Sequence, residues 1–265
     1  MPSHIDLIYS VTPTRSMRLK LHLPDEAQTS ARPLPVVMWF VGGGWRNCEY
    51  RWAPIELLKE GFAVISVEYR ITPEFVAPDN VHDCKAAVRW VRANAAKYNL
   101  SPDRIGLMGS SAGAHLALLL AMTPDHPLLE GEGGNPGFSS NVQAVVGYCG
   151  PTDLTRVGKS ELPNYNPLID PVYAYLGGPT YERMEMARLL SPITHVSSRC
   201  PPVLTFHGDQ DFLVLLEESL NLHKALDAAG AADHTHVTLP GEKHGINREP
   251  TYETVAAFFR RTLTV

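Results

Sequence analysis

The stretch Gly109-Ser110-Ser111-Ala112-Gly113 decides how this chain can fold. It follows a short apolar run at 104–108, which is typical of a buried strand, and it precedes an apolar run at 114–121, which predicts a buried helix. A G-x-S-x-G motif in a sharp turn between a strand and a helix is typical of a nucleophile elbow. The glycines leave room for backbone that passes very close, and the helix start directs free N–H groups toward the serine. The motif alone is weak, because small residues alternate by chance in many loops.

The composition predicts one large globular domain. The chain has 265 residues, of which 44% are hydrophobic and 19% charged, and no linker or change in composition divides it. We therefore expect a single domain over 1–265. The formal net charge of −5 argues against nucleic acid or an anionic membrane surface as a partner. Nothing in the sequence predicts an oligomeric state.

The first residues and the cysteines of the chain indicate in which cellular compartment the protein is expected. Residues 1–6 have neither a basic segment nor an apolar stretch of the kind found in signal peptides, and no run is long enough to span a membrane. Cysteines 48, 84, 149 and 200 are scattered without C-x-x-C spacing. We expect reduced thiols and a cytoplasmic protein, with an exported protein whose signal has been removed as the alternative.

Alternating strand and helix patterns indicate an α/β fold. Two opening runs that alternate apolar and polar residues predict an antiparallel pair, and later continuous apolar runs predict buried strands. We expect a mostly parallel central sheet with helices on both faces. Residues 123–140 are predicted to be a loop, and 155–190 an insertion over the sheet edge that forms a lid or cap. The expected strands are 5–9, 17–23, 36–41, 62–67, 104–108, 142–149, 203–206 and 235–239, and the expected helices are 52–60, 79–98, 114–121, 214–229 and 249–262.

Three residues at the carboxyl ends of predicted strands form a candidate catalytic triad. They are Ser111, Asp211 and His244, in the chain order typical of an α/β-hydrolase. A serine hydroxyl needs a base to take its proton, and the base needs a group that orients it. Asp209 is the alternative carboxylate. Ser110 is the competing serine, but its place in the turn favours Ser111 as the nucleophile.

The other histidines near these motifs are predicted to be structural. His207, His234 and His236 lie in or at strands and are expected to pack or face solvent. His115 follows the elbow on the buried face of its helix and is expected to form a structural hydrogen bond. The triad needs no metal or organic cofactor, and we predict none.

Backbone N–H groups are expected to form an oxyanion hole. The residue after the nucleophile, Ala112, supplies one donor in this geometry. Three consecutive glycines follow the predicted strand at 36–41, and among them Gly43 and Gly44 are the candidate donors. Trp45 and Ser110 are candidate substrate contacts. Tyrosines of the insertion (165, 173, 175 and 181) either line the acyl and alcohol pockets or pack within a lid.

Taken together, the motifs resemble an α/β-hydrolase of the carboxylesterase group, most closely the small bacterial feruloyl and acetyl (acetylxylan-type) esterases. The resemblance covers most of the chain, from about residue 5 to 262, and it implies the same triad, with Asp83 and the pair Tyr69-Arg70 as structural anchors. One position departs from the pattern: Val41 replaces the histidine of H-G-G-G-W, a residue thought to brace the oxyanion loop. The matching segments are 41–45, 69–70, 82–83, 109–115, 207–211 and 242–245.

We therefore predict a serine carboxylesterase that cleaves short-chain acyl or aryl esters through an acyl-enzyme, with acetyl or feruloyl esters of carbohydrates as a substrate hypothesis. An amidase, arylformamidase or peptidase with the same triad is the nearest alternative. A catalytically silent binding protein on the same fold is the alternative from another class.

Overall fold

The computed structural model describes residues 4–25, 32–50, 52–158 and 166–264. An eight-stranded sheet runs through the molecule in the order β1-β2-β4-β3-β5-β6-β7-β8. The first two pairings in this order, β1 with β2 and β2 with β4, are antiparallel and confirm the expected antiparallel opening, whereas the five remaining pairs of neighbours are parallel. The strands are β1 His4–Val11, β2 Ser16–His22, β3 Leu34–Phe40, β4 Ala63–Val67, β5 Leu100–Ser110, β6 Ala144–Tyr148, β7 Val203–Gly208 and β8 His234–Leu239.

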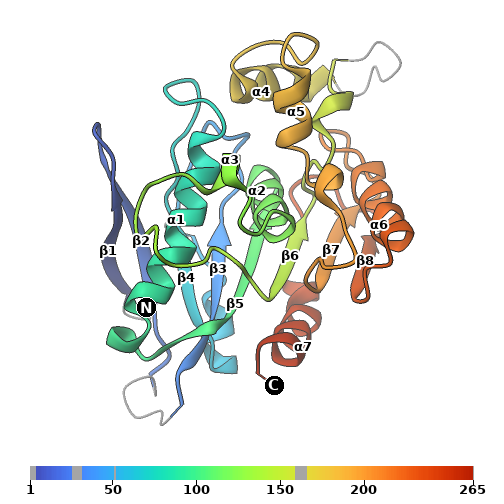
Figure 1. Cartoon of the computed structure of the whole chain (residues 1–265). Helices are drawn as coiled ribbons and strands as arrows, with labels where there is room; N and C mark the ends of the chain where they lie inside the picture. The colour runs from blue at the N-terminus through green and yellow to red at the C-terminus, as the bar shows by residue number, and fades with distance from the viewer. Residues whose placement is uncertain (1–3, 26–31, 51, 159–165, 265) are drawn as a thin grey trace.

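Helices cover both faces of this sheet (Figure 1). One apolar cluster packs α1, α2 and α6 against one face, and a second cluster packs η1 and α7 against the other. This arrangement confirms the predicted α/β-hydrolase type of fold. The helices are α1 Asp79–Asn94, α2 Ala112–Met122, α3 Pro127–Glu130, α4 Asn166–Leu176, α5 Met184–Leu189, α6 Glu217–Ala229 and α7 Tyr252–Leu263, with 3-10 turns η1 Ile55–Glu60, η2 Ala96–Tyr98, η3 Leu154–Arg156, η5 Pro192–His195 and η6 Glu249–Thr251.

The register of the parallel strands brings their carboxyl ends to one edge. Phe40 lies opposite Gly109, Ser110 opposite Tyr148, and Gly208 opposite Leu239. All seven residues of β3 are buried, which is why its sequence is continuously apolar. The loops that follow β3, β5, β7 and β8 therefore emerge close together, and they carry the candidate site residues.

Two segments differ from the sequence-based expectation. The segment predicted as a helix at 52–60 forms only the 3-10 turn η1, which ends at Gly61 in a left-handed conformation. The segment predicted as a loop at 123–140 contains the short helix α3. Glu130, the last residue of α3, forms ion pairs with Lys85 and Arg89 of α1. Lys85 and Arg89 lie 45 and 41 positions earlier in the chain than Glu130, so no local pattern reveals the ion pairs.

The segment predicted as an insertion, 155–190, holds the end of η3 and the helices α4 and α5, while 159–165 lie outside the described residues. In Figure 1, α4 and α5 lie beyond the end of the sheet to which the parallel strands point. Within the described ranges, the helices are all too short or too polar to cross a membrane.

Candidate active site

The turn after β5 holds Ser111 in a strained conformation. Ser111 has φ 53° and ψ −123°, a region that residues with a Cβ rarely adopt and that costs about 1–3 kcal/mol. Its N–H donates to the carbonyl oxygen of Tyr148 at 2.8 Å, which ties the turn to the neighbouring strand β6. Ser111 is also the residue that precedes α2, so the free N–H groups of the first helical turn lie beside it.

The two outer glycines of the motif are required by close packing. A Cβ on Gly109 would lie 2.3 Å from the carbonyl oxygen of Gly113, and a Cβ on Gly113 would lie 2.0 Å from the carbonyl oxygen of Phe40. Both distances are far below a van der Waals contact, so the start of α2 can approach the end of β3 only with glycine at these positions.

The structure brings the three predicted triad residues into one hydrogen-bonded row. Nε2 of His244 lies 2.9 Å from Oγ of Ser111, and Nδ1 of His244 lies 2.8 Å from Oδ2 of Asp211. Because a carboxylate only accepts hydrogen bonds, the network assigns the ring proton of His244 to Nδ1 and leaves Nε2 free to accept the Ser111 hydroxyl proton. This is the arrangement that nucleophile, base and orienting acid require.

Of the two candidate acids, only Asp211 reaches the imidazole. Its second oxygen, Oδ1, accepts the backbone N–H groups of Leu213 and Val214 at 2.9 and 3.0 Å. Asp209 is exposed, and its side chain accepts the N–H of Gly241 instead. The turn after β7 therefore presents Asp211 inward and Asp209 outward.

His207 is a neighbour of Asp211 that the sequence reasoning assigned only to packing or solvent. Its ring is buried, and Nε2 lies 2.8 Å from the carbonyl oxygen of Val214 and 3.3 Å from Oδ2 of Asp211. Both neighbours are acceptors, so Nε2 carries the proton, and Nδ1 accepts from the Ser219 hydroxyl at 2.8 Å. The i, i+4 spacing of His207 and Asp211 around a tight turn is the signal that could have suggested this contact.

The pKa shifts of Asp211 and His244 share one cause, which is the hydrogen bond between them. Burial works to raise the pKa of Asp211, but hydrogen bonds from His207 and His244 outweigh it and hold that pKa well below its usual range. Burial works to lower the pKa of His244, but the hydrogen bond to Asp211 outweighs it and raises that pKa above its ordinary value. The carboxylate of Asp211 therefore favours the protonated form of the His244 imidazole.

The glycine loop after β3 lies against the elbow. A Cβ on Gly42 would lie 2.8 Å from the carbonyl oxygen of Ser110 and 3.1 Å from the Cβ of Ser111. Gly43 and Gly44 have φ values of 132° and 59°. Within the described ranges, the N–H groups of Gly43, Gly44 and Ala112 donate no backbone hydrogen bond. Gly43, Gly44 and Ala112 therefore remain the predicted donors of the oxyanion hole.

Hydrogen bonds to backbone oxygens hold the glycine loop at Val41 and at Trp45. The backbone oxygen of Val41 accepts a 2.7 Å hydrogen bond from the hydroxyl of the buried Tyr69. The carbonyl oxygen of Trp45, at the other end of the loop, accepts the N–H of Thr72 at 2.8 Å. The segment that follows β4 therefore holds both ends of the glycine loop by hydrogen bonds to backbone oxygens, which do not involve the side chain at position 41.

The expectation that the Trp45 ring contacts substrate is wrong. Trp45 is 1% exposed and stacks on Tyr175 of α4, with ring centroids 4.4 Å apart. Its edge contacts His115 of α2, whose Nε2 lies 2.7 Å from the carbonyl oxygen of Leu190, so His115 forms the structural hydrogen bond that was predicted. A left-handed backbone at Trp45, with φ 57°, accompanies this inward-facing ring.

The remaining predicted substrate contacts divide by exposure. Tyr175 is buried with Trp45, so it packs instead of lining a pocket. Tyr181 is 73% exposed, and Tyr165 lies outside the described residues. Ser110 is half-buried at the end of β5 and remains a predicted contact.

The predicted structural anchor forms an ion pair away from the triad. Nε of Arg70 lies 2.9 Å from Oδ2 of Asp83, and the backbone N–H of Arg70 donates to the same carboxylate oxygen. The pair joins the segment after β4 to α1.

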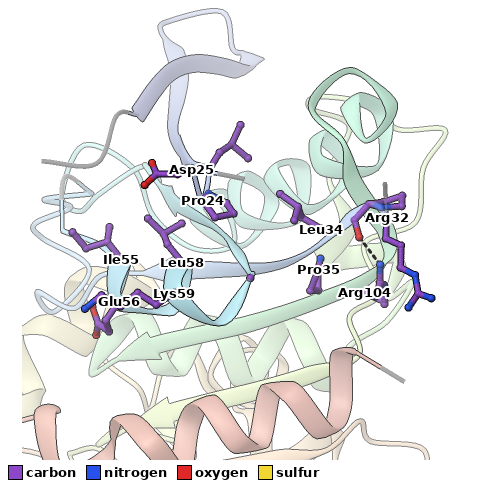
Figure 2. A pocket seen from close by; sticks show the side chains of 13 residues that line it. Pro24, Asp25, Arg32, Leu34, Pro35, Ile55, Glu56, Leu58, Lys59 and Arg104 are labelled. Carbon is purple, nitrogen blue, oxygen red and sulfur yellow. Dashed lines mark hydrogen bonds between the residues drawn. The ribbon is translucent and has the colours of Figure 1, made fainter. Parts of the chain in front are cut away.

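A cavity of about 930 Å³ lies away from the triad, at the edge of the sheet where the parallel strands begin (Figure 2). Leu34 and Pro35 at the start of β3 line it, together with Ile55 and Leu58 of η1 and with Arg104. Ser111, Asp211 and His244 are not among its lining residues. The cavity is therefore separate from the candidate active site.

The chain is similar to several proteins that are named as esterases. It is 30% identical over 220 residues to the probable carboxylic ester hydrolase LipM of Mycobacterium tuberculosis, covering 80% of this chain and 49% of that protein. It is 32% identical over 237 residues to esterase LipQ of the same organism, covering 86% of this chain and 53% of that protein. The chain thus spans about half the length of these relatives.

The solved structures include a similar one that matches along nearly the whole chain. A truncated form of a carbohydrate esterase from gut microbiota superposes with a TM-score of 0.84 at 28% identity, covering 99% of this chain and 97% of that one. The model of the BD-FAE family matches residues 19–226, which carry Ser111, Asp211 and the glycine loop. The chain therefore belongs to the BD-FAE family and has the α/β-hydrolase fold.

Proposed function

We propose that this protein is a serine carboxylesterase that cleaves esters of short acyl chains, with Ser111, His244 and Asp211 as its catalytic triad. The observation that carries the proposal is the continuous row of contacts, 2.9 Å from Ser111 Oγ to His244 Nε2 and 2.8 Å from His244 Nδ1 to Asp211 Oδ2. The row starts at a strained serine and ends at a buried carboxylate, which is what activation of a hydroxyl requires.

In the proposed reaction, Ser111 Oγ attacks the ester carbonyl carbon while its proton moves to Nε2 of His244. Collapse of the tetrahedral intermediate breaks the bond to the alcohol, which leaves with that proton. A water molecule then attacks the acyl-enzyme, gives a proton to Nε2, and releases the acid and free Ser111. Asp211 keeps the imidazole in the tautomer whose Nε2 can accept each proton.

In this proposal, backbone N–H groups stabilise the negative charge of the tetrahedral intermediate. Ala112 contributes its N–H from the start of α2, and Gly43 and Gly44 contribute theirs from the glycine loop. These groups are held by the fold before substrate arrives, so little reorganisation opposes their action. Removal of one such donor in serine hydrolases costs roughly 10²–10³ in kcat.

The substrate class we propose is an acetyl or feruloyl ester of a carbohydrate. It is supported by the similarity to the gut carbohydrate esterase. We propose further that 1–265 act as one domain and that the segment 155–190 roofs the pocket. A Cβ on Gly44 would lie 3.6 Å from that of Pro171 in α4, so this helix borders the glycine loop. The four free cysteines are consistent with a cytoplasmic location.

Hydrolysis of p-nitrophenyl acetate, butyrate and octanoate by the wild type and by Ser111→Ala tests this function. We expect rapid cleavage of the short esters and a loss of about 10⁴-fold or more in kcat in the variant, with an unchanged melting temperature. Equal rates for the two proteins would contradict the serine mechanism. Acetylated xylan and methyl ferulate then test the carbohydrate substrates, which would be wrong if both stayed intact while p-nitrophenyl acetate was cleaved.

The same triad could act on an amide. A side-by-side assay on formylkynurenine and on acetate esters separates an arylformamidase from an esterase, and we expect kcat/KM to be far higher for the esters.

A further inference from the structure

Cys149 lies beside the catalytic base and acid, yet the proposed reaction does not use it. It directly follows β6, its side chain is 1% exposed, and its Sγ lies 3.4 Å from the backbone oxygen of His244. Cys149 also has φ 43°, a left-handed conformation that costs a residue with a Cβ roughly 1–2 kcal/mol. The fold therefore keeps a thiol at this position in an unfavourable backbone conformation.

Three kinds of metal ligand converge at this point. The Sγ of Cys149, a carboxylate oxygen of Asp211 and a ring nitrogen of His244 all lie within 4.8 Å of one another. In a tetrahedral zinc site, bonds of about 2.0–2.3 Å place neighbouring ligand atoms roughly 3.3–3.8 Å apart. Movements of about 1 Å would bring the three atoms to those separations. We propose that these three side chains form an inhibitory binding site for a thiophilic divalent cation of the zinc class.

The ligand set selects the type of ion. A thiolate with an imidazole suits Zn²⁺, Cd²⁺ and Co²⁺, whereas Mg²⁺ and Ca²⁺ prefer all-oxygen sites. Three protein ligands leave a fourth position for water, as in open zinc sites. The ion can approach along His244, because this side chain is 21% exposed and Lys243 and Gly245 on either side of it are exposed.

Binding at this site would remove the base without filling the substrate pocket. The ion takes the lone pair of Nδ1, so the single proton of the neutral imidazole moves to Nε2, which can then only donate to Ser111. The Cys149 thiol releases its proton to solvent when it binds as a thiolate, so one proton leaves for each ion bound, and binding strengthens as pH rises. We expect inhibition that lowers kcat and leaves KM unchanged.

A Co²⁺ titration of the metal-free protein tests the site without reference to activity. A cobalt–thiolate bond gives a charge-transfer absorption band in the near ultraviolet, which we expect in the wild type at one ion per chain and which Zn²⁺ should abolish by competition. Cys149→Ser should lose the band. Cys200→Ser is the matched control, because Cys200 is half-buried and precedes β7, whereas Asp211 follows the other end of that strand. This control should retain the band.

A second arm measures Zn²⁺ inhibition of p-nitrophenyl acetate hydrolysis and rests on the esterase function proposed above. We expect reversible inhibition of the wild type, restored by a chelator, and at least about a tenfold higher Zn²⁺ requirement in Cys149→Ser, each protein being compared with its own uninhibited rate. A missing band in the wild type, a band that persists in Cys149→Ser, or equal Zn²⁺ sensitivity of the two proteins would each overturn the site. An inactive wild type that gives the band would instead contradict the esterase function and leave the metal site supported.

Discussion

Two buried polar networks of this molecule use similar groups to different ends. Between α1 and α3, Nζ of the fully buried Lys85 contacts Glu130 and the backbone oxygen of Thr123, both at 2.6 Å, and the hydroxyl of Ser140 at 3.2 Å. Its three protons are all matched by acceptors. At the active site, the His244 side chain stays 21% exposed and ends on a serine hydroxyl.

The two networks differ in whether a group can exchange its hydrogen-bond partner. In the Lys85 network, each proton of the ammonium group has an acceptor in the fold, so this group stabilises the packing of α1 against α3. In the proposed triad, the Ser111 oxygen exchanges its hydrogen bond for a covalent bond to substrate, and the proton then remains on His244. Shifted pKa values occur in both networks, so a shifted pKa marks a reactive site only where a nucleophile and an open face accompany it.

The largest change expected is in catalysis, for Asp211→Asn. Loss of the carboxylate leaves His244 in the wrong tautomer, and we expect kcat to fall about 10⁴-fold. The variant also shifts the pH profile. Only neutral His244 is active, and Asp211 raises its pKa, so removing the charge should move the acid limb of kcat/KM to lower pH. Measured pH–rate profiles that show the limb unmoved would contradict the role of Asp211, and Asp209→Asn is the control with an exposed carboxylate.

The next largest change is in stability, for Glu130→Gln. This variant leaves Lys85 and Arg89 buried without their counter-charge, which should destabilise the fold by about 3–5 kcal/mol. The activity of the molecules that remain folded should be unchanged. Urea unfolding measures the loss of stability, with the exposed Glu253→Gln as control.

The same residue predicts a pH dependence of stability. Burial works to raise the pKa of Glu130, but Lys85 outweighs it and lowers the pKa. The ion pairs therefore stabilise the fold above the ordinary glutamate pKa, and this contribution disappears as pH falls through the lowered value. The free energy of unfolding should therefore decrease more steeply between neutral and acid pH in the wild type than in Glu130→Gln. Parallel curves would contradict the assignment.

The smallest change tests the contact between His207 and Asp211. In His207→Asn the shorter side chain cannot reach both Val214 and Ser219, so Asp211 loses one donor and part of its fixed orientation. We expect kcat to fall roughly tenfold at unchanged KM, since one misplaced group beside the reacting atoms weakens the geometry without touching substrate. Ser219→Ala, which removes only the partner of Nδ1, should have a smaller effect. A larger effect on KM than on kcat would show that His207 acts elsewhere.

The elbow and the triad were predictable because each leaves a recognisable pattern in the sequence. Gly109 and Gly113 are dictated by backbone that passes within contact distance, and the order of Ser111, Asp211 and His244 follows from a parallel sheet whose strand ends share one edge. Fold class and strand positions followed from continuous apolar runs for the same reason.

The roles of several other residues were not predictable in this way. A tryptophan after three glycines fits a pocket wall as well as a core, and only the approach of Tyr175 from α4 places Trp45 inside. The same holds for α3, which depends on cations from α1, and for Tyr69, whose hydroxyl braces the backbone of Val41.

By itself, the sequence determined the sheet, the strained turn at Ser111 and the residues able to form a triad, because glycine spacing and apolar periodicity act over a few neighbouring residues. Only the tertiary structure decided that His207 supports Asp211 and that Cys149 lies against His244. The contact between Cys149 and His244 joins residues that follow separate strands, and its distance depends on the register and twist of the whole sheet, which no local pattern contains. The contact between His207 and Asp211 spans one turn, and how that turn folds sets its 3.3 Å distance.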